Sequence, residues 1–242
     1  MVYKILFAAF TSLLFIFQNP GRVTAQTPQP QFEVGAQFST IGLSIGRATT
    51  VTSIPCVVPP CPVVVNASGE RTMEPGFGGR IGYNLNRYFA VEAEANIFPR
   101  DREGDGGRKV QLVAGAKVGR RYDKVGVFAK ARPGFIRLSR GDYQFGSGGC
   151  ITVFPPPLAC YVPIAKTSFA FDAGGVFEVY PSSRTIIRFD AGDTIVRYGP
   201  RIVPVIIDAG GGSTSFARAV AVPAPKQTVH NLQLSVGVGF RF

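Results

Sequence analysis

The chain has 242 residues, a formal net charge of +11, 29 glycines and no tryptophan. Its length suits one domain or a small barrel with loops. The charge could indicate a nucleic-acid-binding protein, but the basic residues do not gather on one face or helix, so we expect no nucleic-acid partner.

Residues 1–25 are typical of an export signal. Lys4 supplies a positive charge, and a mostly apolar run follows from Ile5 to Phe17. This run is too short for a transmembrane helix, which needs about 20 residues. We therefore expect a signal peptide at 1–25 and an exported domain at 26–242.

Eight segments alternate apolar and polar residues with the two-residue period of a β-strand. They cover 32–46, 75–85, 88–98, 108–119, 124–138, 165–180, 184–198 and 228–242. Their connections alternate between tight turns, such as Asn86-Arg87, and long segments at 47–74, 99–107, 139–164 and 199–227. Antiparallel neighbours joined in this way place every long loop at one end of a barrel, as in outer-membrane barrels.

The last segment shows the alternation most clearly, with bulky side chains on one face and small or polar ones on the other. The bulky face consists of His230, Leu232, Leu234, Val236, Val238, Phe240 and Phe242. A soluble barrel would place its large side chains inside, whereas this set suits lipid and the opposite set suits a narrow hydrated lumen. The first segment keeps the pattern up to Thr40, where we expect a bulge to shift its phase.

The alternation therefore predicts an all-β fold, an eight-stranded antiparallel transmembrane up-and-down β-barrel. The chain also resembles the bacterial eight-stranded outer-membrane barrels related to the transmembrane domain of outer membrane protein A and to outer membrane protein X. The resemblance covers about residues 31–242 and rests on the run from Asn86 to Glu94 (NRYFAVEAE), on Phe189-Asp190 and on the terminal Gly239 to Phe242.

This resemblance implies a place in the bacterial outer membrane, with lipid and lipopolysaccharide as neighbours. It also implies insertion by the barrel assembly machinery, which would recognise the C-terminal strand. Because the pattern ends with the last strand, we expect no peptidoglycan-binding domain after it.

The polar faces of the segments carry many charges that would point into the lumen. The candidate lumen network consists of Glu33, Arg80, Glu92, Glu94, Lys109, Lys117, Lys130, Arg132, Asp172, Glu178, Arg188, Asp190 and Arg241. A desolvated, unpaired charge is costly, so the two signs should pair across the lumen. Two interpretations stay open: an ion-pair network that fills a barrel about as wide as its side chains, and a gated path for ions or small solutes.

Three polar residues break the pattern on the outer face. Asp193 and Arg197 lie in the seventh segment, and His230, the only histidine, begins the eighth. Some outer-membrane barrels are hydrolases that use a histidine, but no HxS arrangement or carboxylate lies near His230 in the sequence. We therefore expect all three residues at the outer rim, with His230 among the lipid headgroups and no catalytic residue.

Two long loops each contain a pair of cysteines flanked by proline, Cys56 with Cys61 and Cys150 with Cys160. Export would place them in an oxidising space, where an even number favours disulfides. Sharing a loop favours the local bridges Cys56–Cys61 and Cys150–Cys160, although four cysteines permit three pairings. Neither loop offers a histidine or a CxxC motif, so we expect no metal and no cofactor.

The long loops are apolar for exposed segments, with Val, Ile and Pro gathered in Val57–Val65 and Arg201–Ile207. They could extend as β-hairpins, form a binding surface for an extracellular ligand, or do both. The sequence thus predicts a monomeric, non-enzymatic barrel with an envelope-structural or surface-interaction role. A narrow channel for ions or small solutes is the alternative.

Overall fold

The structure is a computed structural model that describes residues 31–43, 48–53, 63–67, 72–101, 106–146, 161–208 and 217–242. Every regular element in these ranges is a β-strand. The described part of the chain holds no helix long and apolar enough to cross a membrane. The predicted signal peptide and the four cysteines lie outside the described residues, so the cleavage and the disulfides stay predictions.

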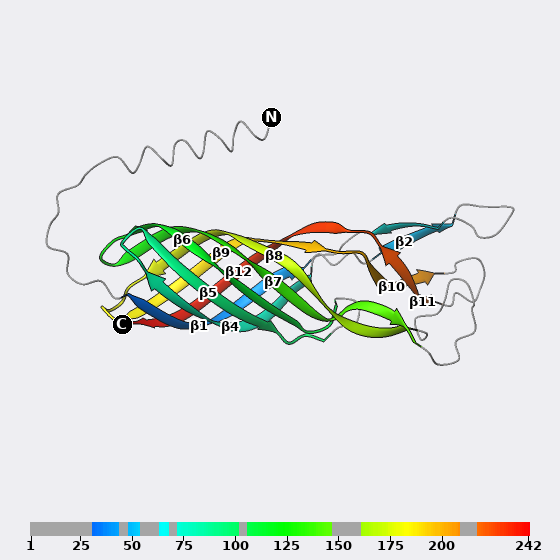
Figure 1. The fold of residues 1–242 in the computed structure, drawn as a ribbon, viewed down its shortest axis with the longest axis horizontal. Coiled ribbons are helices and arrows are strands. Elements are labelled where there is room, and N and C mark those ends of the chain that lie inside the picture. The colour runs from blue at the N-terminus through cyan, green and yellow to red at the C-terminus, as the bar shows by residue number, and fades with distance from the viewer. Residues whose placement is uncertain are drawn as a thin grey trace, which may run out of the picture.

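Eight strands form one closed antiparallel barrel (Figure 1), which confirms the predicted fold class. They are β1 (Phe32–Leu43), β4 (Thr72–Asn84), β5 (Phe89–Phe98), β6 (Lys109–Arg121), β7 (Val125–Phe145), β8 (Tyr161–Val179), β9 (Thr185–Tyr198) and β12 (Gln227–Arg241). Strand β1 pairs with β12 on one side and with β4 on the other. Closure leaves no unpaired edge in the barrel wall, and lipid tolerates none.

The two ends of the barrel differ in their connections (Figure 1). Short turns join β4 to β5, β6 to β7 and β8 to β9 at the end where the C-terminus lies. All longer connections lie at the other end. Since outer-membrane barrels have short periplasmic turns and long extracellular loops, we assign the short-turn end to the periplasm and the other end to the cell exterior.

Two β-hairpins extend from the extracellular end (Figure 1). One pairs β2 (Ala48–Ser53) with β3 (Val63–Ala67), and the other pairs β10 (Arg201–Asp208) with β11 (Ala217–Ala224). Strands β7 and β8 also continue past the barrel wall, after a register shift between Leu138 and Asp142. The apolar run Arg201–Ile207, and the end of Val57–Val65 from Val63 onward, therefore lie in additional strands outside the barrel.

The predicted bulge near Thr40 is wrong. Strand β1 pairs with β4 in one unbroken register from Phe32 to Leu43, so Ile41 and Leu43 point inward and are buried. The sequence suggested a phase shift because these inward residues are apolar where a hydrated lumen would require polar ones. The bulge in the barrel wall lies in β7 instead.

The outer face is apolar over its middle, as lipid requires. Phe77 and Ile81 on β4 are 58% and 60% exposed, and Val238 on β12 is 52% exposed. Each alternates with a buried or partly buried neighbour that points inward. A charge placed in the middle of this face should therefore be costly.

We predict that Leu234→Arg, in the middle of β12, lowers the free energy of unfolding by about 2–4 kcal/mol. Met73→Arg, at the extracellular end of β4, should cost about 0–1 kcal/mol because an arginine there reaches the interface. The chain has no tryptophan, so the folded fraction in urea is best read from the gel mobility of unboiled samples. Equal costs at the two positions would contradict the membrane placement of the barrel.

Candidate functional site

The barrel interior is the candidate site, because it gathers the charged residues that the alternation assigns to the lumen. All members of the candidate network are buried there. They lie in layers that follow one another along the strands. On β1, for example, Glu33, Gln37 and Ile41 occupy successively higher levels from the periplasmic to the extracellular end.

The periplasmic layer consists of Glu33, Lys117, Arg121 and Glu178. The Lys117 Nζ lies 2.5 Å from Glu178 Oε1 and 3.5 Å from Glu33 Oε2. Arg121 Nη2 lies 2.9 Å from Glu33 Oε1, and Tyr180 donates a hydrogen bond of 2.6 Å to Glu178. Each carboxylate in this layer thus faces two cations, because Arg121 also approaches Glu178 at 3.7 Å.

Arg132 holds the upper side of the central layer together. Its guanidinium lies 3.0 Å from Glu92 Oε1, 2.5 Å from Glu94 Oε2 and in contact with Asp172. Arg132 is 1% exposed, and Asp172 is fully buried. One side chain from β7 therefore binds a carboxylate on the neighbouring β8 and two carboxylates on β5, beyond β6.

Arg188 and Lys130 complete the central layer. Arg188 lies 2.6 Å from Glu92 and 2.7 Å from Asp190, and Lys130 lies 3.0 Å from Asp172 and 3.3 Å from Asp190. Arg188 also lies 3.7 Å from Glu178, which joins the central and periplasmic layers. The two layers thus form one connected network.

An uncharged layer of amide and hydroxyl groups lies above the central layer. Gln37 donates a 2.9 Å hydrogen bond to Asn96, and Asn96 donates to Gln111 at 3.0 Å. Gln111 and Gln233 bond across the lumen at 3.0 Å, and Gln233 also donates to Ser39 at 3.2 Å. This amide layer links β1, β5, β6 and β12 without a net charge.

An apolar layer fills the extracellular end of the barrel. It consists of Ile41, Leu43, Phe98, Ile136, Leu138, Ala170, Val196 and Tyr198. One ion pair lies at this level, Lys109 Nζ to Glu74 Oε1 at 2.5 Å, and both side chains are fully buried. The lumen is therefore not polar throughout, contrary to the hydrated interior that the alternation suggested.

Two candidate residues depart from the expected pairing with carboxylates. Arg241 donates to the carbonyl of Ser183 at 2.8 Å and lies over the Tyr180 ring, so it closes the periplasmic turn. Arg80 is 5% exposed, and its Nη1 and Nη2 atoms have no hydrogen-bond partner among the described residues. A Cβ at Gly35 would meet Val238 O at 2.9 Å, Gly239 Cα at 3.2 Å and Arg80 Nε at 3.3 Å, so this glycine leaves room for the neighbouring strand and for the arginine.

Without Arg241, which closes the periplasmic turn, and Arg201, which lies over the Tyr198 ring at the extracellular end, the buried charges of the described residues balance. Seven cations are Arg80, Lys109, Lys117, Arg121, Lys130, Arg132 and Arg188, and seven anions are Glu33, Glu74, Glu92, Glu94, Asp172, Glu178 and Asp190. A buried charge is tolerated when an opposite charge and hydrogen bonds compensate it. An interior with equal numbers of positive and negative side chains can therefore exclude water. An interior with charges of one sign could not.

Two members of the network, Glu74 and Arg121, were not predicted from the sequence. Glu74 fell in the long segment 47–74 and Arg121 in an expected turn, because β4 begins earlier and β6 ends later than their apolar patterns indicate. Extending the two-residue alternation by one step at those strand ends would have found both residues.

The outer rim carries a side-chain hydrogen bond that the sequence did not suggest. His230 Nδ1 on β12 lies 2.5 Å from Asp193 Oδ2 on β9, and the side chains are 63% and 42% exposed. The pairing of β9 with β12 places His230 beside Ile195, two residues from Asp193. Cross-strand register, which the sequence does not state, therefore supplies the carboxylate.

The sequence over residues 8–242 matches the family described as outer membrane protein beta-barrel domain. The chain belongs to this family. The outer membrane beta-barrel family places the protein in the bacterial outer membrane. No curated protein matches the sequence significantly.

Among solved structures, the chain is similar to the attachment invasion locus protein of Yersinia pestis, with 12% identity, a TM-score of 0.44 and coverage of 89% of this chain and 100% of that one. It is also similar to the outer membrane protein OprG from Pseudomonas aeruginosa (10% identity, 88% and 96% coverage, TM-score 0.43). Neisserial surface protein A is a third such structure (15% identity, 87% and 97% coverage, TM-score 0.41).

The described residues contain no group of three or more His, Cys, Asp or Glu side chains arranged to hold a metal ion. Every carboxylate in the central layer instead lies within 3.3 Å of a lysine or arginine nitrogen. The lysine and arginine side chains of the central layer therefore compensate the charges of its carboxylates inside the barrel.

We predict that Arg132→Met lowers the free energy of unfolding by about 3–5 kcal/mol, because it leaves the buried Glu94 without an ion pair and removes one cation each from Glu92 and Asp172. Arg120→Met is the matched control, since Arg120 lies on the outer face at the periplasmic rim, and it should change stability by about 0.5 kcal/mol or less. Urea unfolding of both variants in the same vesicles measures the difference. Indistinguishable unfolding curves would show that the central layer does not stabilise the barrel.

Proposed function

We propose that the protein is a non-enzymatic, monomeric outer-membrane scaffold, with a filled barrel that holds strands and loops at the cell surface. Its role would be structural in the envelope or interactive at the surface. The observation that carries this proposal is the layered interior. Two charged layers, an amide layer and an apolar layer follow one another across the width of the membrane.

The filled interior argues against free passage of solutes. An eight-stranded barrel is just wide enough for its side chains to fill it. An ion crossing it would have to break pairs in the periplasmic and central layers and then enter the apolar layer around Phe98 and Ile136, where it would lose its hydration. The barrel therefore suits a rigid support better than a conduit.

Hydrogen bonds connect the strands that extend from the extracellular end of the barrel. Asp142, on the continuation of β7, accepts hydrogen bonds from Lys166 Nζ at 2.6 Å and from the Ile202 amide at 2.7 Å. Lys166 also contacts the carbonyl of Pro200. These bonds attach the start of the β10–β11 hairpin to the β7–β8 extension. A ligand at the cell surface would meet a platform of connected strands.

The membrane partners of the proposed scaffold follow from its outer face and its last strand. Lipid and lipopolysaccharide would surround the apolar wall, and the barrel assembly machinery would recognise β12, whose pairing with β1 closes the barrel. Any extracellular ligand would contact the hairpins.

A narrow channel for ions or small solutes is the second candidate function. The observation that favours it is Arg80, a buried cation whose terminal nitrogens lack partners among the described residues. Such a group could attract an anion into the lumen. This candidate requires the apolar layer to open.

We predict that the purified protein produces no single-channel steps in a planar bilayer. A variant with Phe98→Gly, Ile136→Gly and Leu138→Gly should conduct more than the native chain, because it removes much of the apolar layer. The gel mobility shift on boiling must show that both proteins are folded. Stable steps from the native protein that change in Lys130→Ala or Glu92→Ala would overturn the scaffold and support the channel.

A further inference from the structure

Arg80 on β4 is a buried arginine that forms neither an ion pair nor a hydrogen bond with the described residues. Its side chain is 5% exposed, and its terminal nitrogens Nη1 and Nη2 both lack a hydrogen-bond partner. The carboxylate opposite Arg80 in the sheet belongs to Glu94 on β5, but Glu94 binds Arg132 at 2.5 Å. An unpaired guanidinium costs free energy here, because burial removes it from water and no opposite charge replaces the lost hydration.

The Arg80 side chain turns away from β5 and lies over glycines of β1 and β12. Its Nε lies 3.3 Å from the position that a Cβ would occupy at Gly35, and its Nη2 lies 3.5 Å from the corresponding position at Gly239. Gly35 pairs with Gly239, and Gly237 is the next inward residue on β12. These three inward positions carry no side chain, so neither β1 nor β12 fills the lumen beside the guanidinium.

A second arginine that no described carboxylate pairs with lies on the same part of the wall. Arg241 follows Gly239 on the inward face of β12 and is buried. Its guanidinium donates hydrogen bonds to the carbonyls of Ser183 and Ser182, which are neutral groups. Arg80 and Arg241 therefore both bring uncompensated positive charge to the region where β12 pairs with β1.

The charges of the periplasmic and central layers, counted together with these two arginines, leave one positive charge in excess. The seven cations are Arg80, Lys117, Arg121, Lys130, Arg132, Arg188 and Arg241, and the six anions are Glu33, Glu92, Glu94, Asp172, Glu178 and Asp190. Each of these carboxylates already forms at least one ion pair. A monovalent anion would restore the balance, whereas water would satisfy the donors without cancelling the charge.

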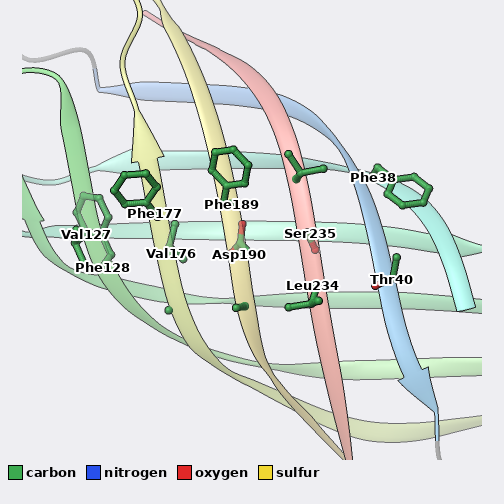
Figure 2. Close-up of a pocket in the computed structure, with 13 residues that line it drawn as sticks. Phe38, Thr40, Val127, Phe128, Val176, Phe177, Phe189, Asp190, Leu234 and Ser235 are labelled. Carbon is green, nitrogen blue, oxygen red and sulfur yellow. The ribbon is translucent and has the colours of Figure 1, made fainter. Parts of the chain in front are cut away.

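The barrel wall encloses this region. Strand β12 pairs with β1 from Gln233 to Arg241 and with β9 from Gln227 to Phe240, without a break in either register. Figure 2 shows the outer side of this wall, where Phe38, Phe189 and Leu234 lie on β1, β9 and β12. These apolar side chains face lipid, and the apolar layer closes the extracellular side. An anion would therefore enter from the periplasmic end or during folding.

We propose that the lumen binds one small monovalent anion, of the size of chloride, at Arg80 beside the glycines of β1 and β12. Nη1 and Nη2 would donate charge-assisted hydrogen bonds to it, which are stronger than those between neutral groups. The anion would act as a structural counterion that completes the cancellation of charge inside the barrel. Binding does not require the apolar layer to open, so the proposal stands whether the barrel is silent or conducts in a planar bilayer.

Urea unfolding at constant ionic strength, with chloride exchanged for the much larger gluconate, tests the proposal. A ligand that binds only the folded state raises the folding equilibrium constant, up to about tenfold for each tenfold rise in its concentration. We expect the native protein to show this dependence on chloride and Arg80→Met to lose it. Arg87→Met is the matched control, because Arg87 is exposed at the turn between β4 and β5, and it should keep the dependence.

Crystals of the native barrel grown in bromide give an independent readout. Anomalous scattering should place one bromide ion in contact with the Arg80 guanidinium. The proposal is overturned if only water lies there, if the native protein is equally stable in chloride and gluconate, or if Arg80→Met keeps the native dependence on chloride. The bromide crystals of the native protein decide the matter even if Arg80→Met fails to fold.

Discussion

Cancellation of charge inside a narrow barrel is the constraint on which the rest of this structure depends. Eight strands enclose a space that side chains fill, so each inward charge is removed from bulk water and needs a partner of opposite sign. The chain meets this need with carboxylates and cations on different strands, as when Arg132 on β7 binds Glu94 on β5 and Asp172 on β8. The contact with Asp172 joins neighbouring strands and the contact with Glu94 reaches past β6, so both hold strands of the wall together from within.

The two faces of the wall solve different problems with the same two-residue alternation. Inside, the charged layers are followed by the amide layer and then by the apolar layer toward the extracellular end. The apolar layer, which blocks the lumen, therefore lies where the surface strands begin. Outside, lipid is met by apolar residues, and exposed cations such as Arg120 and Arg197 lie near the two rims. A barrel that is filled inside and apolar outside is suited to supporting surface strands in the membrane.

The fold and the inward charges could be predicted from the sequence because lipid imposes a strict alternation on every strand. The layering could not, since Ile41, Ile136 and Leu138 are apolar on a face where hydration was expected. Glu74 was missed because β4 begins at Thr72, three residues before the segment that the apolar alternation predicts. The pairing of His230 with Asp193 depends on strand register, which is fixed by closure of the whole barrel and not by local sequence.

The most direct test of the filled interior is the access of a membrane-impermeant thiol reagent to position 39. Ser39 is fully buried in the amide layer, with its Oγ 2.9 Å from Ser235 Oγ, and Ser39→Cys changes its size little. In a variant whose native cysteines are replaced by serine, the account predicts no labelling of folded Ser39→Cys from either side of a vesicle and complete labelling after unfolding. Rapid labelling of the folded barrel would show an open aqueous lumen and contradict the account.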